Sequence, residues 1–380
     1  MIKIEMVTSQ RDLKKFITFP EKLYKENKYW VPALIADEFD SLRKDRNSSF
    51  EFCDADYFLA YKDKEIVGRV AAIINNNANR DWKKKTVRFG WIDFIDDIEV
   101  TKALLKAVLD WGKERGMEEM KGPLGFIDLD KEGLLVEGFD KYPSITTIYN
   151  FPYYKEHFEK LGLVKDVDWI QRCFDLPEEI PEKIEKFQDI IKDRYGLYIY
   201  EPKNKKELKS IGIELFHVMN KAFTHIYEYT PLSEKQIKQA VDKYIPIVNI
   251  DFVCLVCNKE DKVVGYGITM PQLSEAVRKA KGRLFPFGFY HLLKGLNNYK
   301  TLESLMIGVD PEYHNKGFNS LMFSHLHKNS LKYGVKHVIL NPQLETNIAA
   351  LALFNRYNAQ PYQRRRCFTA KLEELDKNLG

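Results

Sequence analysis

The segment from Thr301 to Tyr333 constrains the fold most strongly, because it has the pattern of a buried strand, a short polar turn and a helix. Apolar residues alternate along 301–309, and the pattern stops at Asp310-Pro311, where a central strand cannot continue. Helical spacing of apolar residues begins near 315–318. The first backbone N–H groups of a helix have no acceptor within it, and Lys316 adds a positive charge beside them. Strand, glycine turn and helix in this order favour binding of a phosphate or pyrophosphate.

Within this segment, VDPEYHNKGFNSLM resembles the acyl-CoA-binding segment of the Gcn5-related N-acetyltransferases, whose pattern is Val-x-Pro followed by Arg/Gln-x-x-Gly-x-Gly/Ala. Gly317 matches the first glycine, whereas His314 stands at the Arg/Gln position and Asn319 replaces the second small residue. The resemblance implies acetyl-CoA or another acyl-CoA as co-substrate and no metal. It assigns the CoA contacts of this segment to Ile307, Gly308, Val309, His314, Asn315, Lys316, Gly317, Phe318 and Asn319.

A second segment, ETNIAALALFNRYNAQPYQRRRCF, resembles the next motif of the same family, Asn-x-x-Ala-x-x-x-Tyr-x-x-x-Gly-Phe. Asn347 and Ala350 match it, and Phe354 stands where the family has Tyr. The resemblance adds Asn347 and Phe354 to the CoA site. In the family this Tyr protonates the departing CoA thiolate, so Tyr357 is the candidate acid here, the alternatives being bulk water as the acid and Tyr357 as an ordinary half-buried aromatic.

The length of 380 residues allows two domains, and 44% hydrophobic with 30% charged residues is typical of a soluble globular protein. The net charge of +4 gives no argument for a nucleic-acid or membrane partner, and no signal peptide or membrane-spanning run is present, so we expect a cytoplasmic protein. Five scattered cysteines indicate reduced thiols. Cys254 and Cys257 have CxxC spacing but lie in an apolar run, which favours a buried strand over a metal or redox site.

Both halves of the chain show strands and helices in the same order, without residue similarity. Together with the resemblance, this order predicts an α/β fold of two acetyltransferase-like domains in tandem, each with a mixed, mostly antiparallel sheet flanked by helices. We expect a degenerate domain over 1–176, a charged linker over 177–194 and the CoA-binding, catalytic domain over 195–380.

The first half lacks the anion-binding turn. Its corresponding strand-to-helix segment, DFIDDIEVTKALL, contains no glycine, and Asp96, Asp97 and Glu99 crowd the start of the helix. Carboxylates cap a helix well but repel a pyrophosphate at the same place. We therefore expect the first domain to be structural or to form a wall of the acceptor pocket.

Aromatic residues supply candidates for that wall. The segment before the helix at 153–161 and the insertion at 271–300 are both rich in phenyl and phenol groups. The prediction is a substrate-facing surface for a fatty or aromatic acceptor, or for an acyl chain longer than acetyl; the alternative is an aromatic domain interface. The substrate-binding candidates are Tyr149, Asn150, Tyr153, Phe287 and Tyr290.

The resembled family transfers the acyl group by direct attack of an amine on the thioester in a ternary complex. The matching oxyanion donors are the backbone N–H groups of Gly308 and Val309, and Gly308 also fits a local bulge. Glu303 is a candidate base that strand alternation places on the face of Ile307, unless it is simply solvated. His225 is the other candidate base.

Three hypotheses follow. The first is an acyl-CoA-dependent N-acyltransferase acting on a small-molecule amine or amino acid, with no nucleic-acid or membrane partner. The second is an aminoacyl-tRNA-dependent transferase of the tandem type, and the third is a non-catalytic binding protein on a degenerate fold. Gly317, Lys316 and Asn347 favour the first over the second, and His314, Asn319 and Phe354 support the third.

Overall fold

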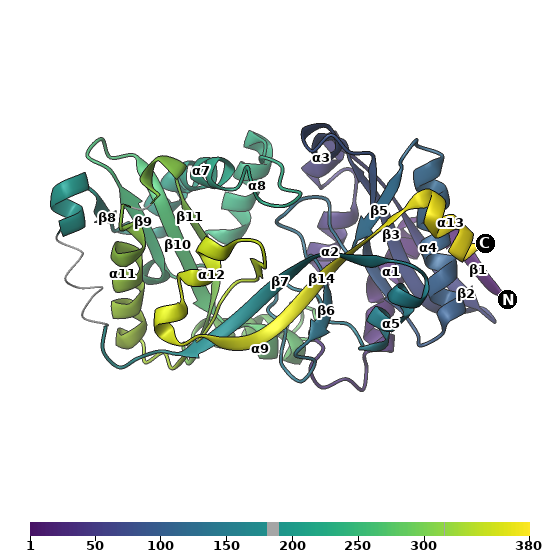
Figure 1. Ribbon diagram of the computed structural model, residues 1–380. Helices are drawn as coiled ribbons and strands as arrows, with labels where there is room; N and C mark the ends of the chain where they lie inside the picture. Colours follow the sequence, from purple (N-terminus) through teal and green to yellow (C-terminus); the bar gives the residue numbers. More distant parts are fainter. Residues whose placement is uncertain (181–189, 315) are drawn as a thin grey trace. The chain divides into compact units, whose positions relative to one another are not determined.

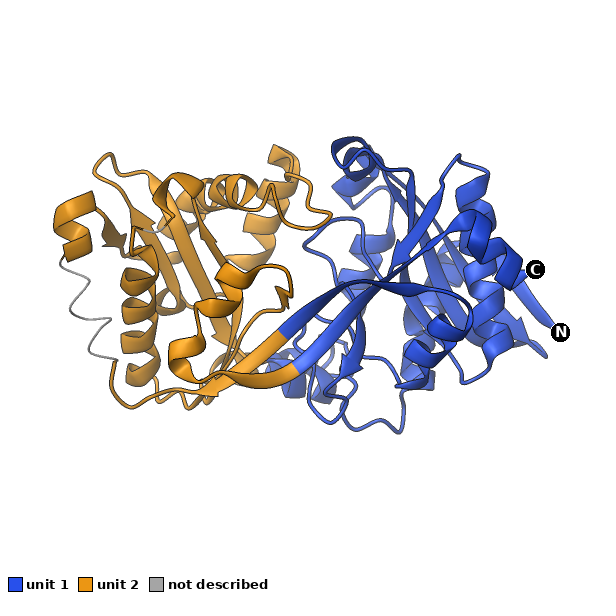
Figure 2. Ribbon diagram, in the orientation of Figure 1, with its two compact units in different colours: residues 1–170, 273–292, 363–380 blue, residues 171–272, 293–362 orange. Residues whose placement is uncertain are grey.

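The computed structural model describes residues 1–180, 190–314 and 316–380, which form two compact units (Figure 2). Unit 1 comprises Met1–Ile170, Leu273–Leu292 and Gln363–Gly380, and unit 2 comprises Gln171–Gln272 and Leu293–Tyr362. Each unit contains a central sheet flanked by helices, so the predicted α/β fold class is confirmed (Figure 1).

The sheet of unit 1 follows the order β1-β2-β3-β4-β5-β14. All of its neighbouring strands with a defined register are antiparallel except β4 and β5, which are parallel. The short strand β6 pairs with β14. The strands are β1 (Ile2–Met6), β2 (Cys53–Lys62), β3 (Glu65–Asn75), β4 (Thr86–Phe94), β5 (Glu119–Gly122), β6 (Leu134–Glu137) and β14 (Gln360–Lys371), and the helices are α1 (Gln10–Leu23), α2 (Ile35–Leu42), α3 (Asn76–Asp81), α4 (Ile98–Lys113), α5 (Tyr153–Lys160), α9 (Ser274–Lys279) and α13 (Leu372–Leu379).

Helix α4 forms the centre of the unit 1 core. Val100, Leu104, Leu105 and Val108 recur at helical spacing and are completely buried in a cluster with apolar residues of β3 and β4. Asp97 caps the helix by accepting a hydrogen bond from the Glu99 N–H at 3.1 Å. The expected carboxylate cap is thus present, and it occupies the helix start that an anion would need.

The sheet of unit 2 follows the order β7-β12-β11-β10-β9-β8. The pair β11 and β12 is parallel, and the other neighbouring pairs are antiparallel. Strand β13 (Gln343–Leu344) pairs with β7. The strands are β7 (Val164–Asp175), β8 (Tyr198–Tyr200), β9 (Val253–Cys257), β10 (Val263–Pro271), β11 (Thr301–Val309) and β12 (His337–Ile339), and the helices are α7 (Lys205–Ala222), α8 (Glu234–Tyr244), α11 (Phe318–Lys332) and α12 (Ile348–Ala352). Strand β7 and helix α10 (Gly288–Leu296) cross between the units, because unit 1 includes β7 up to Ile170 and α10 up to Leu292.

The compact units interleave along the chain, which differs from the contiguous division at 176 and 195 expected from the sequence. The end of β7 enters the sheet of unit 2, where Phe174 pairs with Val338 of β12. The end of β14 enters the sheet of unit 1, where Phe368 pairs with Gly122 of β5. Each half of the sequence therefore contributes its last strand to the unit that the other half mainly builds. Half of the expected linker, 181–189, lies outside the described residues.

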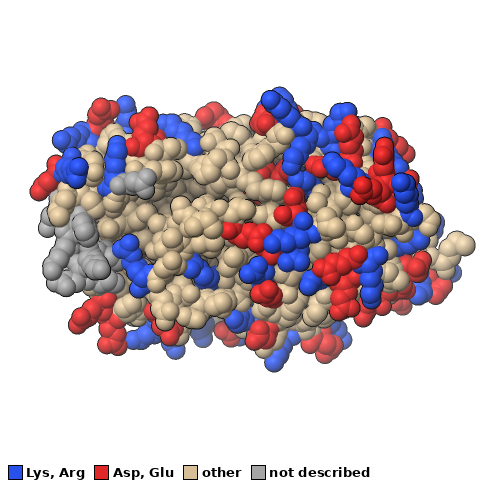
Figure 3. All heavy atoms as spheres, in the orientation of Figure 1, with Lys and Arg blue, Asp and Glu red and all other residues tan. Residues whose placement is uncertain are grey.

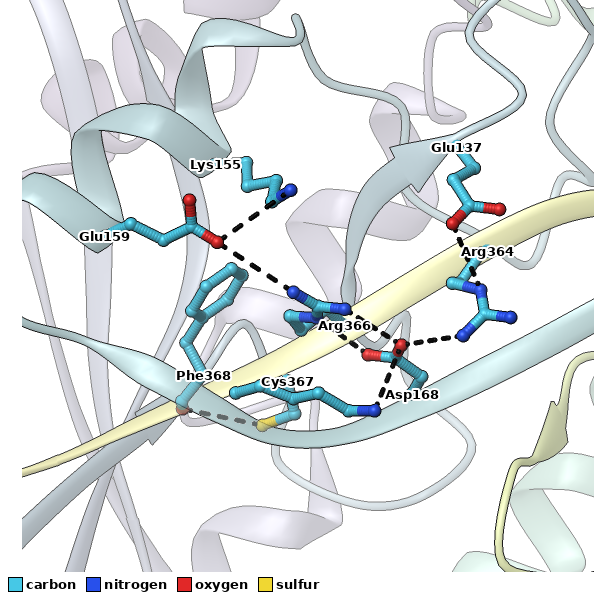
Figure 4. A network of polar contacts seen from close by, with 9 residues as sticks. Glu137, Lys155, Glu159, Asp168, Arg364, Arg366, Cys367 and Phe368 are labelled. Atoms are coloured by element: carbon cyan, nitrogen blue, oxygen red, sulfur yellow. Dashed lines mark hydrogen bonds and ion pairs between the residues drawn. The ribbon is translucent and has the colours of Figure 1, made fainter.

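A buried carboxylate holds the C-terminal strand in unit 1. Asp168 of β7 is fully buried and accepts hydrogen bonds from Arg366 Nε at 2.8 Å and Arg364 Nη1 at 3.1 Å, with Lys165 Nζ at 3.4 Å (Figure 4). The two arginines form further ion pairs with Glu159 and Glu137. Burial alone would raise the pKa of Asp168, but the hydrogen bonds from the two arginines outweigh it and hold the pKa below its ordinary value.

Replacing Asp168 by Asn should lower the free energy of unfolding by about 2 kcal/mol, because two arginines lose their shared counter-ion while part of each stays solvated. The carboxylate stabilises the fold fully above the ordinary carboxyl pKa of about 4, and this contribution is lost as the pH falls through the lowered folded-state pKa. Denaturant unfolding at pH 7 and pH 3 measures both effects. Asp376→Asn, at an exposed ion pair with Lys113, is the control and should change stability much less. Equal losses of stability in the two variants would contradict the role of Asp168 as the shared counter-ion of the two arginines.

Candidate active site

The sheet of unit 2 opens beside β11. Parallel pairing between β11 and β12 covers three residue pairs, from Thr301 with His337 to Glu303 with Ile339. Beyond Glu303, β11 continues to Val309 and pairs with β10 alone among the described strands. The backbone groups of 304–309 that point away from β10 therefore face no neighbouring strand in the described part of the chain. A ligand with amide groups can form hydrogen bonds to them.

A β-bulge lies at the same point. Ile268 pairs with Met306 and Thr269 pairs with Ser304, which leaves Leu305 as the extra residue of β11. The extra residue reverses the alternation, so Leu302 and Ile307 both contact the apolar core on the α11 side. Glu303 consequently lies on the opposite face from Ile307, and the prediction that they share a face is wrong.

Gly308 is not the site of the bulge, which corrects a second prediction. It pairs regularly with Tyr266, and a Cβ at this position would lie 2.6 Å from the Tyr266 ring. The absence of a side chain thus makes room for a buried aromatic ring. The bulge three residues earlier was hidden because Leu305 and Ile307 give the sequence an uninterrupted apolar alternation.

Two buried hydroxyl groups flank the bulge. Thr269 and Ser304 lie opposite each other on β10 and β11, and neither hydroxyl forms a hydrogen bond with any described residue. Glu303, with 2% of its surface exposed, is the next residue of β11. Buried polar groups left without partners cost stability and are kept mainly where a ligand or reaction uses them. The sequence analysis missed both hydroxyls, although a Ser and a Thr inside apolar strands were a usable signal.

The turn after β11 keeps the features of an anion site. Gly317 adopts the left-handed region, with φ of 76°, and stands at the N-cap of α11, where no side chain of a described residue is seen to cap the helix. A Cβ at this position would lie 2.7 Å from Ile191 Cδ1, so only glycine fits. Lys316 and the exposed His314 adjoin the turn, whereas Asn315 lies outside the described residues. The start of α4 in unit 1 is capped by Asp97, so the two helices differ where an anion would bind.

The remaining predicted CoA contacts divide between the surface and the core. Asn347 caps α12 by accepting a hydrogen bond from the Ala350 N–H at 3.1 Å. Phe354 is buried in the unit 2 core, with its ring centroid 5.1 Å from that of Phe323. Phe354 therefore supports the fold around α11 through packing, and Phe318 does the same by packing on Gly265.

Tyr357 lines a cavity of about 590 Å³ in unit 2. Its ring stacks on Phe174 at 4.6 Å, and burial raises the pKa of its phenol to about 12. The strand ends Thr301 and Ile339 also line the cavity. Because Ile339 pairs with Glu303 in the parallel register, the Glu303 side chain lies on the same sheet face as these two residues. Glu303 is not itself among the residues that line the cavity, and Tyr357 packs in the core on the α11 side, the opposite face of the sheet from Glu303. The structure therefore does not bring these two predicted catalytic residues together.

The third predicted catalytic residue, His225, is exposed in the turn after α7, whereas Glu303 and Tyr357 are both buried. Its role as a base stays a prediction. Of the two candidate bases, Glu303 is the one that lies on β11, at the position where this strand separates from β12.

The predicted substrate-binding aromatics of unit 1 are divided between the interior and the surface. The Tyr149 hydroxyl donates to the Phe139 carbonyl, and the Tyr153 hydroxyl donates to the Phe94 carbonyl. The Asn150 side chain accepts a hydrogen bond from the Leu135 N–H and donates one to the Leu135 carbonyl. Phe287 and Tyr290 are instead 75% and 61% exposed. These two groups do not enclose a common apolar pocket, because the first is packed into the fold and the second projects into solvent.

The CxxC sequence lies in β9, where both thiols are buried and unpaired with each other. Burial raises the pKa of the Cys257 thiol to about 11 and that of Cys254 further. Burial thus favours the protonated form of both thiols at neutral pH. The described residues contain no group of three His, Cys, Asp or Glu side chains arranged to hold a metal ion.

Comparison with solved structures decides the fold. The chain matches a tandem GNAT protein from the clavulanic acid biosynthesis pathway, with a TM-score of 0.56 and 10% identity over 98% of this chain and 99% of that one. It also matches the GCN5-related glucosamine N-acetyltransferase region of a fungal multi-domain β-N-acetylglucosaminidase, with a TM-score of 0.56 and 13% identity over 97% of this chain and 38% of that one.

This chain has the tandem GNAT fold. No family model matches its sequence. Among curated proteins, it is 28% identical to Protein YghO of Escherichia coli strain K12 over 374 residues, covering 96% of this chain and 94% of that protein. It is 25% identical to the bacterial ceramide synthase of Caulobacter vibrioides over 313 residues, covering 81% and 80%.

Replacing Thr269 by Val or Ser304 by Ala should leave stability unchanged or raise it by up to about 1 kcal/mol, because each change removes a buried hydroxyl without a hydrogen bond to described residues. Thermal and denaturant unfolding of the two variants measures this effect. A loss of more than about 2 kcal/mol would show that the hydroxyls support the fold. Ser330→Ala, which removes a buried hydroxyl bonded to the Leu326 carbonyl at 2.7 Å, is the control and should destabilise.

Proposed function

We propose that this protein is an acyl-CoA-dependent N-acyltransferase whose chemistry takes place in unit 2. The observation that carries the proposal is the coincidence of an uncapped helix start at Gly317 with the separation of β11 from β12 beyond Glu303. The first feature is suited to a pyrophosphate and the second to an extended arm with amide groups. Acyl-CoA has both parts.

The proposed donor lies along β11. Its pyrophosphate binds the free N–H groups at Gly317 and Phe318, with Lys316 adding positive charge. Its pantetheine arm follows the unpaired side of 304–309, a strand length of about 20 Å. The thioester then lies near the bulge, within reach of the hydroxyls of Thr269 and Ser304.

In the proposed reaction, the acceptor amine attacks the thioester carbonyl directly. A C–N bond forms, the C–S bond breaks, and the Glu303 carboxylate takes the proton that the amine releases. The hydroxyls of Thr269 and Ser304 beside the bulge stabilise the negative charge on the carbonyl oxygen. They take the place of the predicted N–H donors of Gly308 and Val309, which lie about 10 to 13 Å further along β11. Tyr357, which its raised pKa keeps protonated, gives a proton to the departing thiolate.

A long-chain amine is the proposed acceptor, which narrows the amine class expected from the sequence. The relative from Caulobacter vibrioides is named a ceramide synthase, and a ceramide is the amide of a fatty acid with a long-chain amino alcohol. The likeness extends over 81% of this chain, so it includes residues of both units. A fatty acyl-CoA is the corresponding donor.

Surface charge gives no support for a tRNA donor. On the faces of the two units visible in Figure 3, Lys and Arg groups are interspersed with Asp and Glu groups. An extended field of one sign, as a polynucleotide backbone requires, is not present on that view of the described residues. The charge distribution on this view therefore supports CoA over tRNA as the carrier of the acyl group.

Gly317→Glu should abolish micromolar binding of acetyl-CoA, because it places a side chain and a negative charge at the start of α11. Isothermal titration calorimetry on the wild type and the variant measures the affinity, and we expect a loss of at least about a hundredfold, which corresponds to about 2.7 kcal/mol.

Gly334→Glu is the matched control. Gly334 has a similar positive φ of 70° and follows the other end of the same helix, and a Cβ at this position would meet no other atom within 4 Å. The variant should bind acetyl-CoA like the wild type. Absence of binding to the wild type at millimolar CoA, or equal loss in both variants, would overturn the donor assignment.

Glu303→Gln should lower kcat by about a hundredfold with little change in acyl-CoA affinity, because the amide keeps the shape but cannot accept the amine proton. Tyr357→Phe should lower kcat by a smaller factor, since water can replace a phenol as the acid. Thiol release from a fatty acyl-CoA with a long-chain amine as acceptor measures both. Tyr362→Phe, which changes another phenol of the same cavity, is the control. Full activity of Glu303→Gln would contradict its role as the base.

A further inference from the structure

The segment that follows α9, including the first turn of α10, presents an exposed apolar surface on unit 1. Phe285 is 79% exposed, and Leu284, Phe287, Phe289 and Tyr290 are also exposed. We call these five residues the aromatic loop. Contiguous exposed apolar side chains are uncommon on soluble proteins and mark surfaces that bind a partner or a lipid.

The backbone beneath the aromatic loop is held in place by unit 1 (Figure 2). The Ser274 hydroxyl donates to the Pro143 carbonyl at 2.6 Å, and the Ile35 N–H donates to the Gly282 carbonyl at 2.9 Å. Arg278 donates to the Tyr142 hydroxyl at 3.1 Å. The segment is therefore anchored on one side while its aromatic side chains point outward.

Backbone hydrogen bonds close the turn, while its side chains stay exposed. The Phe289 N–H donates to the Leu284 carbonyl at 2.7 Å, and the Tyr290 N–H donates to the Phe287 carbonyl at 3.2 Å. A Cβ on Gly288 would lie 1.7 Å from the Arg283 carbonyl oxygen, so only glycine permits this path. The chain thus uses a compact, internally bonded turn that projects its apolar groups.

Charge distinguishes between possible partners of this surface. From Ala276 to Leu302 the sequence contains six Lys and Arg residues and no Asp or Glu. Lys279 and Arg283 each form one ion pair, with Glu275 and Glu21, and Lys281 is exposed without an ion pair to any described residue. Projecting aromatic groups bordered by basic ones are typical of elements that lie in the interface of an anionic bilayer.

A second copy of the chain fits this surface less well. A two-fold symmetric contact would place the aromatic loop against itself and bring Lys281 and Arg283 of both copies together. Like charges brought close in a partly desolvated contact repel each other. An anionic lipid surface instead pairs every basic group with a headgroup while the aromatic groups enter the apolar layer.

We propose that the aromatic loop, together with Lys279, Lys281 and Arg283, docks this protein on an anionic lipid surface. The docking goes beyond the acyl-transfer chemistry and does not depend on it. Among the described residues, no helix has the length and apolar character needed to cross a bilayer, so the attachment is at the surface. It replaces the expectation from the sequence that no membrane partner exists, and it would bring the protein to the place where long-chain amines reside.

Sedimentation with vesicles tests the proposal without acyl-CoA or acceptor. We expect the full-length protein to bind vesicles made of equal parts phosphatidylglycerol and phosphatidylcholine, and to bind pure phosphatidylcholine at least about tenfold more weakly. Phe285→Ser combined with Phe287→Ser should weaken binding to the anionic vesicles at least about tenfold. Lys281→Glu should weaken it less and should reduce its salt dependence.

Met6→Ser combined with Val164→Ser is the matched control, because it removes two exposed apolar side chains of unit 1 outside the aromatic loop. It should bind vesicles like the wild type, and thermal unfolding of every variant establishes that it is folded.

Vesicle binding that is equal in wild type and the aromatic variant would overturn the proposal. The proposal would also be overturned if the wild type did not bind vesicles but formed dimers, and the aromatic variant did not form them. Since calorimetry with acetyl-CoA is a separate measurement, failure of docking and failure of the proposed acyl transfer are distinguishable.

Discussion

Unit 2 depends on one interruption of its sheet, where hydrogen bonding between β11 and β12 stops at Glu303. A continuous sheet would satisfy every backbone group of β11 and leave nothing for a ligand to bind. The interruption leaves one hydrogen-bonding edge of 304–309 available, while β10 pairs with the other edge. The extra residue Leu305 at the same point changes which side chains face the core, so the opening also decides where Glu303 points. The exposed backbone edge of β11 and the direction of the Glu303 side chain thus both arise at the position where β11 separates from β12.

The N-cap residues of α4 in unit 1 and α11 in unit 2 differ in whether they have a side chain that caps the helix. In unit 1, Asp97 caps α4 and also pairs with Lys62 at 2.8 Å, and this ion pair helps to hold the pKa of Asp97 below its ordinary value. In unit 2, Gly317 leaves α11 without a side-chain cap. The first choice gains stability for the helix, and the second gives up that stability and leaves the helix start open for the anion binding proposed above. Two units with the same fold can therefore differ in the chemistry of a single turn.

Much of the fold was predictable because its signals are local. The sequence pattern predicts helices over 205–223 and 233–244, and α7 and α8 match these limits to within one residue. Ser233 forms the capping box that marks the start of α8. The glycine turn at Gly317 was also evident from sequence. The bulge at Leu305 was not, because apolar alternation continues through it and only pairing with β10 reveals the extra residue. The exposure of Phe287 and Tyr290 was equally hidden, since an aromatic-rich segment has the same composition whether it is packed inside or projects outward.

The interleaving of the units sets the order in which they can be completed during synthesis. Phe368, Leu372 and Leu375 are buried in the core of unit 1, together with residues of α4 and β4. A ribosome releases these residues after every residue of unit 2, which ends at Tyr362. The unit whose synthesis begins first is therefore the last to close its core, and until then its sheet exposes the edge of β5 that β14 will cover. The folding of the first domain is in this way tied to completion of the second.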